Sequence, residues 1–328
     1  MIPKIKNNMR WGFVSARISV LEGKLLTKEF FLNLIAQEHL DDLFQHLQET
    51  LLRDYLSPGT VWEDFTSICD RCFHEMALSI KEDSPSSLPA DFFLLQDDYL
   101  NLKSALQGST DFQFTFGLLP MEKLTNISGG DRADLPRSLQ RSDVRAPAEP
   151  EEVDPEVLDI FLDGAYLRNL LSIAHELKSR LVSAYIRDRA LSYAIAVLWR
   201  ALRQQQPLRR YEQYLLPLGD LTPIVSELSG MPSVESWPSV LEGSIGEILC
   251  ESLELPPDDQ ISGFEVRIAN HLTRIAGHAK MQTAGPERVF SFLAGLHVEI
   301  QNLKLVVNGR LNRIDRNLLR QRLKETYV

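Results

Sequence analysis

Helical periodicity is the feature of this sequence that most restricts its fold. Apolar residues recur at i, i+3, i+4 and i+7 in three stretches, residues 65–80, 158–177 and 289–307, and this spacing places them on one face of a helix. The alternation typical of strands is limited to residues 112–116. A lone strand has no partner for its backbone hydrogen bonds, so we expect this segment to be an extended connector or a helix end. The pattern therefore predicts an all-α fold.

Composition excludes several classes of protein. The chain has 328 residues, of which 44% are hydrophobic, and its formal charge is −10 because 45 Asp and Glu outnumber 35 Lys and Arg. An acidic chain does not suit general nucleic-acid binding, which requires clustered cations. The three Cys are too few for a disulfide framework, the N-terminus lacks a secretory apolar core, and no apolar run reaches about 18 residues. We therefore expect a soluble, cytoplasmic chain that does not span a bilayer.

Three segments rich in turn-forming residues interrupt the helical patterns, at residues 82–89, 128–155 and 256–263. Clusters of Pro, Gly, Ser and Asp predict breaks between helices. The second segment is long enough to form an exposed loop, and it overlaps an acidic run at 149–163 that contains seven acids and no base. We expect this run to be solvated and to lead into a helix N-terminus, where acids are favourable.

A short motif recurs along the chain. It consists of an acid, an Asn three residues later and a Lys five residues later, and each copy follows a long amphipathic helical pattern. The middle copy keeps the acid but has Leu191 and Tyr193 in place of the Asn and the Lys. An Asn within an apolar helix usually satisfies a neighbouring backbone group, so we interpret the motif as a structural anchor. Its residues are Asp98, Asn101, Lys103, Asp188, Glu299, Asn302 and Lys304.

The spacing of these motifs indicates three similar helical units of about 100 residues each. The expected boundaries are 1–116 for the first unit, 117–213 for the second, with its exposed loop at 128–155, and 214–328 for the third.

The sequence contains no catalytic, cofactor-binding or metal-binding motif that we can support. It has neither a G-x-x-x-x-G-K-[ST] phosphate loop nor a G-x-G-x-x-G turn. Cys69 and Cys72 form a C-x-x-C pair, but both lie on the apolar stripe of residues 65–80. A reactive thiol is expected at an exposed helix N-terminus, so we interpret this pair as small core residues.

The C-terminal segment has the opposite charge to the rest of the chain. From residue 300 onward it carries seven Lys and Arg against two acids. We expect Arg313, Arg316, Arg320 and Lys324 to form one stripe of a helix, opposite an apolar side that contains Ile314. Such a stripe is either a solvated helix face or a docking surface for an acidic protein, for lipid headgroups or for a membrane-embedded assembly.

Several stretches resemble one family, the C-type central-stalk subunits of V/A-type rotary ATPases, whose counterpart in the eukaryotic vacuolar enzyme is the d-type subunit. The matching stretches are residues 16–26, 98–103 and 159–166, and a C-terminal region that comprises residues 299–304, 309–312 and 320–328. The middle unit departs from the family pattern at Leu191, where an Asn would stand.

The resemblance implies a funnel of three helical units around a pseudo-threefold axis. Its wide mouth would receive the central-shaft subunits, and its base would sit on the membrane rotor ring of small proteolipid subunits. The resemblance also implies a non-catalytic rotor subunit, peripheral to the membrane on the cytoplasmic side, that transmits torque for ion transport. Two alternatives remain open: a helical scaffold or regulatory module, and a helical enzyme that uses Cys69 and Cys72.

Overall fold

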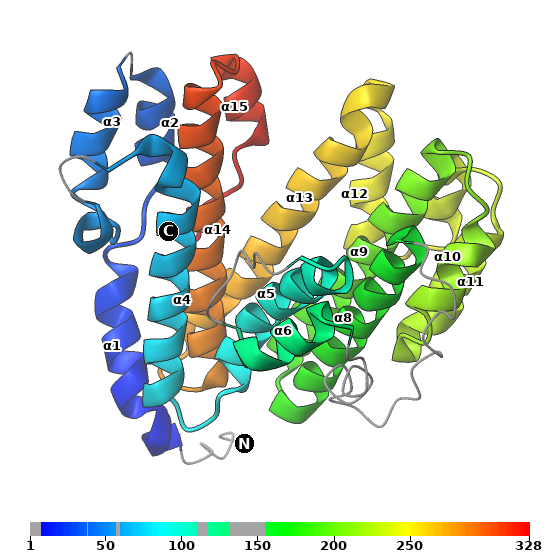
Figure 1. Ribbon diagram of the computed structural model, residues 1–328, viewed down its shortest axis with the longest axis horizontal. Coiled ribbons are helices and arrows are strands. Elements are labelled where there is room, and N and C mark those ends of the chain that lie inside the picture. The colour runs from blue at the N-terminus through cyan, green and yellow to red at the C-terminus, as the bar shows by residue number, and fades with distance from the viewer. Residues whose placement is uncertain (1–7, 38, 57–59, 110–116, 131–154) are drawn as a thin grey trace. The chain divides into compact units, whose positions relative to one another are not determined.

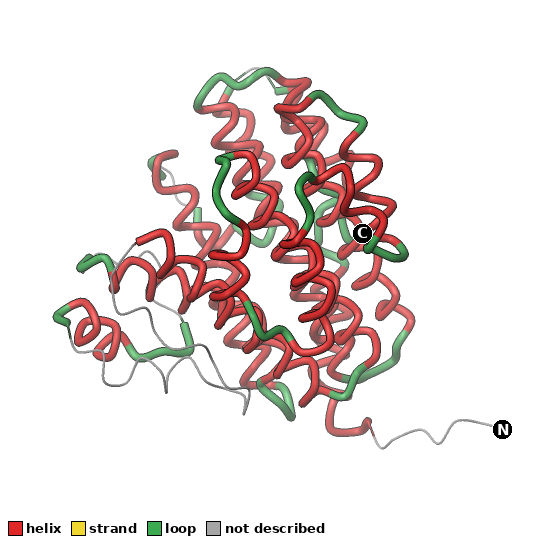
Figure 2. The backbone as a smooth tube through the Cα atoms, turned by 90° about the vertical axis from the view of Figure 1, so that its right-hand side faces the viewer, coloured by secondary structure: helices red, strands yellow, loops and turns green. Residues whose placement is uncertain are grey.

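The described part of the computed structural model is built from helices. It comprises residues 8–37, 39–56, 60–109, 117–130 and 155–328, and these residues contain no strand (Figures 1 and 2). Over these residues the predicted all-α fold is confirmed. None of the helices described here is long and apolar enough to cross a membrane.

The chain divides into two compact units, which we describe separately. Unit 1 combines Met1–Ala90 with Ala269–Val328, and unit 2 comprises Asp91–Ile268. Unit 1 thus joins segments from both ends of the chain. The three-unit division, with boundaries at 1–116, 117–213 and 214–328, stays a prediction, as does the funnel.

Unit 1 is assembled around the long helix α14 (Pro286–Leu311), which contacts α4 (Phe65–Asp83), α1 (Gly12–Glu22) and α2 (Lys28–Ala36) (Figure 1). The other α-helices of this unit are short or belong to it only in part. They are α3 (Leu40–Leu47), α15 (Arg316–Arg322) and the last part of α13 (Pro257–Gly277). Short 3-10 turns occupy Asn8–Trp11, Arg53–Tyr55, Trp62–Asp64 and His278–Met281.

The apolar stripes predicted from periodicity form the core of unit 1. On α4 most of the buried side chains are three or four residues apart, as the period of 3.6 requires, and Phe73 and His74, directly after Cys72, are buried as well. On α14 nearly the whole helix from Arg288 to Gly309 is buried, including Glu299 and Asn302. Helix α14 therefore has neighbours on most sides, and its polar side chains need partners inside the unit.

Unit 2 contains two long helices, α8 (Pro155–Leu177) and α9 (Arg180–Arg203), which pack on each other and on α10 (Leu208–Leu215). Its core includes Trp199, whose ring lies 5.8 Å from that of Phe264. The remaining helices are α5 (Leu88–Leu106), α6 (Met121–Ser128), α11 (Thr222–Gly230), α12 (Ser244–Leu253) and the first part of α13, with 3-10 turns at Gly219–Leu221 and Val234–Ser239.

The predicted breaks have different outcomes. The break at 82–89 is confirmed, because α4 ends at Asp83 and α5 begins at Leu88. The third break lies earlier than the predicted 256–263, because α12 ends at Leu253 and α13 begins at Pro257 and continues through the rest of the predicted segment. Pro is favourable in the first turn of a helix, and the acids Asp258 and Asp259 stabilise its N-terminus. The connector at 112–116 and most of the loop at 128–155 lie outside the described residues.

Candidate functional site

The four basic residues predicted to dock a partner do not lie on one continuous helix. Helix α14 ends at Leu311, and Arg313 follows it with a left-handed φ of 54°. The N–H of Ile314 donates to the carbonyl of Gly309 over 2.8 Å, and the N–H of Arg313 donates to Arg310 over 3.2 Å. These two bonds form a Schellman motif, which closes a helix C-terminus. The prediction of a single helical stripe is therefore wrong.

A new helix starts directly after this turn. The carboxylate of Asp315 accepts hydrogen bonds from the N–H groups of Asn317 (2.8 Å) and Leu318 (3.2 Å), which makes it the N-cap of α15. The carboxylate of Asp315 is thus engaged by the first turn of α15 itself. The chain consequently presents the predicted basic residues on a turn, on a short helix and, for Lys324, on the segment after that helix.

The four residues differ in what they contact. Arg316 donates to the Gln37 carbonyl over 3.1 Å, at the end of α2. The ammonium group of Lys324 donates to the side-chain oxygen of Gln301. Arg313 and Arg320 are exposed. Arg316 and Lys324 therefore help to hold α15 in place. Arg313 and Arg320 are accessible to a partner.

Exposed apolar side chains accompany the two accessible arginines. Ile314 is 40% exposed and Leu318 is 39% exposed. We refer to Arg313, Ile314, Leu318 and Arg320 as the α15 patch. Cations beside exposed apolar groups are suited to a partner that offers acids next to an apolar face.

The motif near the C-terminus binds backbone groups from distant parts of unit 1. The carboxyl group of Glu299 is buried and accepts the N–H of Leu26 over 2.6 Å, just before α2. The amide of Asn302 exchanges two 3.0 Å hydrogen bonds with the backbone of Lys324. Lys304 forms an ion pair with Asp70 on α4. These three residues tie α14 to α2, to the C-terminal segment and to α4.

The motif in unit 2 makes corresponding contacts. The carboxylate of Asp98 accepts the N–H groups of Leu118 (2.9 Å) and Leu119 (3.0 Å), just before α6. Lys103 forms ion pairs with Asp159 (3.0 Å) and Asp163 (2.8 Å) on α8. In both units the acid therefore accepts the N–H of a Leu that precedes a short helix, and the Lys five residues later pairs with an acid on a long helix.

The middle motif replaces the ion pair with a different contact. Asp188 is half-buried on α9, and Tyr193 stands where the other copies have Lys. The hydroxyl of Tyr193 is hydrogen-bonded to Asp163, the carboxylate that also pairs with Lys103. Burial raises the pKa of Tyr193, so its hydroxyl stays protonated and donates. The spacing of five residues was the only signal in the sequence for this contact.

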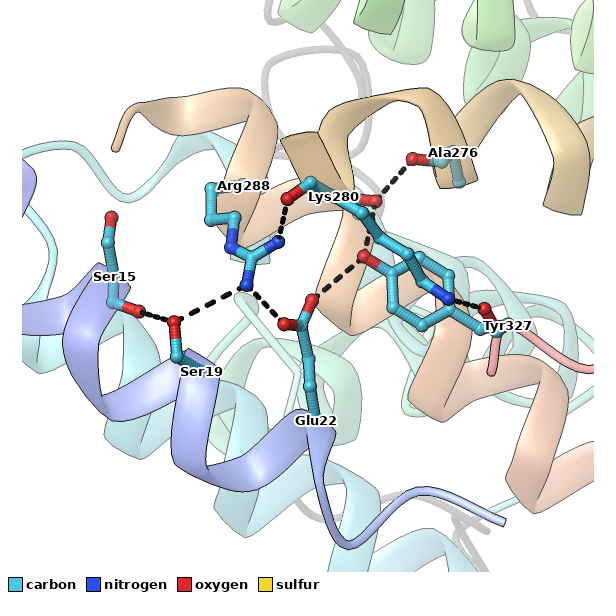
Figure 3. Close-up of polar contacts among 8 residues, drawn as sticks. Ser15, Ser19, Glu22, Ala276, Lys280, Arg288 and Tyr327 are labelled. Carbon is cyan, nitrogen blue, oxygen red and sulfur yellow. Dashed lines mark hydrogen bonds and ion pairs between the residues drawn. The ribbon is translucent and has the colours of Figure 1, made fainter. Parts of the chain in front are cut away.

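Sequence reasoning missed a second polar cluster, which joins α1 to α14 (Figure 3). Arg288 is buried and forms an ion pair with Glu22. The same guanidinium donates to the carbonyl of Lys280 over 2.7 Å and to Ser19 Oγ over 3.4 Å. No motif links Arg288 to α1 in sequence, because these contacts join segments more than 250 residues apart. Arg288 thus fixes α1 against the start of α14.

The C-terminal segment completes this cluster through Tyr327. Its hydroxyl donates to Glu22 over 2.9 Å (Figure 3), and it accepts from Ser291 over 2.9 Å. The ring packs on Gly295, where an added Cβ would stand 2.5 Å from the ring carbon Cγ. The ammonium of Lys280 lies 4.2 Å from the ring centroid, within cation–π range. The cluster therefore binds α1 and the C-terminal segment to α14.

The two cysteines of the C-x-x-C pair are buried on α4. Burial raises the pKa of the Cys72 thiol to about 12 and also raises that of Cys69. A reactive cysteine requires the opposite shift, because the thiolate is the nucleophile. The described residues also contain no group of three or more His, Cys, Asp or Glu able to hold a metal ion.

These features define an all-helical protein whose described polar clusters hold helices together. A family model described as "ATP synthase (C/AC39) subunit" matches residues 14–322. The chain belongs to this family, so it is a subunit of a V/A-type rotary ATPase, and its partners include other subunits of that complex. A comparison with curated proteins finds no match.

Replacing Gly295 with Ala should destabilise unit 1. The new Cβ must displace the Tyr327 ring, and overpacking of this kind costs about 1–3 kcal/mol. Urea unfolding measures the loss. Gly12→Ala is the matched control, because no atom lies within 4 Å of its added Cβ. Equal stability of the two variants would contradict the packing of Tyr327 on α14.

The stability of the protein should fall as the pH rises from 5 to 8, because of Glu299. Burial raises its pKa to about 8, and the bond from Leu26 only partly opposes this shift. The native state therefore holds a proton that the unfolded chain, with an ordinary pKa of about 4.3, has lost. One such group lowers the free energy of unfolding by up to about 1.4 kcal/mol per pH unit in this range.

The Glu299→Gln variant should lose this part of the pH dependence while it keeps an oxygen for the Leu26 N–H. Urea unfolding at several pH values provides the measurement. Glu247→Gln, on the exposed surface of α12, is the control and should follow the wild type. A wild-type slope that persists unchanged in Glu299→Gln would show that another group causes it.

Proposed function

We propose that this chain is the non-catalytic rotor spacer of its ATPase, which docks the central shaft onto the membrane rotor ring and transmits torque. In this proposal it lies on the cytoplasmic side, peripheral to the membrane. Its partners are the central-shaft subunits and the ring of small proteolipid subunits. Membership of the C/AC39 family supports the assignment to the complex.

The observation that supports a torque-bearing role most directly is the set of ion pairs that join the helices of unit 1. A spacer must resist twisting, so its helices need contacts that fix their relative positions. Three ion pairs link helices of unit 1: Glu22 with Arg288, Arg17 with Asp83, and Asp70 with Lys304. All six side chains are less than one third exposed, and an ion pair that is shielded from water is screened less by salt.

The acid-to-backbone contact recurs in the first and third of the three predicted units, which supports an architecture of repeated units. Glu299 and Asp98 each accept the N–H of a Leu that precedes a short helix. A ring of similar units would give the spacer several equivalent contacts around one axis. We propose the pseudo-threefold funnel on this basis.

Purification of the complex tests the assignment of partners. A tagged copy of this chain, isolated under mild detergent and examined by native mass spectrometry, should carry shaft subunits and a ring of small membrane proteins. Recovery of a lone monomer, or of a complex with no ring, would contradict the proposed position.

We propose that the α15 patch is one of the docking surfaces of the spacer. The variant with Arg313→Glu and Arg320→Glu should bind its partner subunits about 5- to 30-fold more weakly at low salt, because both cations are exposed and become acids. The difference should shrink at high salt. A binding assay between the purified chain and the remaining subunits measures the effect.

Arg53→Glu is the control for charge reversal, since Arg53 is exposed elsewhere in unit 1. Arg316 is left unchanged because it holds the end of α2. Unaltered assembly of the double variant at low salt would rule out the α15 patch as a docking surface.

A further inference from the structure

Helix α1 exposes an apolar face. Its inner side packs into unit 1 through Val14, Ser15 and Ile18, which are buried. On the other side, Phe13 is 69% exposed and Val20 is 68% exposed. These two residues are seven apart, so they lie on the same face two turns from each other. Helices that are apolar on both faces are normally covered on both.

The charged side chains on α1 are engaged within unit 1. Arg17 donates to Ser79 Oγ over 2.8 Å and forms an ion pair with Asp83. Glu22 is held by Arg288 and Tyr327. The one acid of α1, Glu22, therefore points into unit 1 and not toward the exposed apolar face.

Cations lie just beyond both ends of α1. Arg10 precedes α1 and Lys24 follows it, and both are exposed. They flank α1, on which Phe13 and Val20 lie about 10 Å apart along the helix axis, given the rise of 1.5 Å per residue. We refer to Arg10, Phe13, Val20 and Lys24 as the α1 strip.

The sequence around the strip has the same charge bias. The first 28 residues contain six Lys and Arg and a single acidic residue before Lys28, Glu22, in a chain whose formal charge is −10. Glu22 is paired with Arg288 and Arg17 with Asp83, so the other five cations give this part of the chain a positive charge, which favours an anionic partner.

We propose that the α1 strip binds the surface of an anionic lipid bilayer. Phe13 and Val20 enter the headgroup region, and Arg10 and Lys24 lie beside lipid phosphates. Helices at membrane interfaces combine an exposed apolar face with flanking cations in this way. A bilayer presents negative charge continuously, so it neutralises cations at both ends of the strip at once. This contact involves lipid alone, so it is independent of the docking of partner subunits.

Vesicle flotation with the purified full-length chain tests the proposal. The chain should bind vesicles of phosphatidylcholine with about one third phosphatidylglycerol, and should not bind pure phosphatidylcholine. Binding should weaken as salt screens the cations. The variants Phe13→Ser with Val20→Ser, and Arg10→Glu with Lys24→Glu, should each lower the partition coefficient at least about tenfold.

Matched controls lie elsewhere in unit 1. Val61→Ser removes an apolar side chain that is 53% exposed, and Arg53→Glu reverses an exposed charge. Both should bind like the wild type. Thermal melting followed by circular dichroism should give every variant a native transition, since the altered side chains are exposed.

Three outcomes would overturn the proposal. The first is equal binding to both kinds of vesicle, and the second is unchanged binding of both double variants. The third is a combination of two results: the wild-type chain fails to bind vesicles, and the variant with Phe13→Ser and Val20→Ser loses a protein partner from the purified complex. This last result would assign the α1 strip to a protein partner.

Discussion

The buried ion pair between Glu22 and Arg288 is the interaction on which the rest of unit 1 depends. A guanidinium inside a protein is costly unless its donors find partners. Arg288, on α14, finds the carboxylate of Glu22, the carbonyl of Lys280 and the hydroxyl of Ser19. These partners come from α1 and from the segment after α13, so both must keep their positions relative to α14. Tyr327 adds the C-terminal segment to the same cluster through Glu22.

A second constraint is the use of buried carboxyl groups to accept backbone N–H groups. Glu299 in unit 1 and Asp98 in unit 2 both fix the chain just before a short helix. The N–H groups of residues that precede a helix take no part in its hydrogen bonds, so a buried carboxyl group that accepts them satisfies these donors and fixes the chain where it enters the helix. Contacts of this kind make a helical protein stiff without a catalytic site. Stiffness is the property that the proposed rotor spacer requires.

The sequence predicted what depends on local pattern and missed what depends on distant contacts. The apolar period on α4 predicted its buried face, and the family motifs identified the rotary ATPase subunit. The end of α14 was missed because Arg313, rather than a Gly, takes the left-handed position that closes the helix. The partnership of Arg288 with Glu22 leaves no local signal, because each residue alone looks like an ordinary surface charge. Pairing across 266 residues arises only when the chain is folded.

In the proposed function, this protein couples rotation in the soluble part of the ATPase to ion movement in the membrane. Ion uptake per ATP hydrolysed, in vesicles that contain the complex assembled with and without this chain, tests it most directly. The account predicts that the complex without the chain still hydrolyses ATP but takes up no ions, and that added purified chain restores uptake. Undiminished uptake per ATP in its absence would contradict the claim.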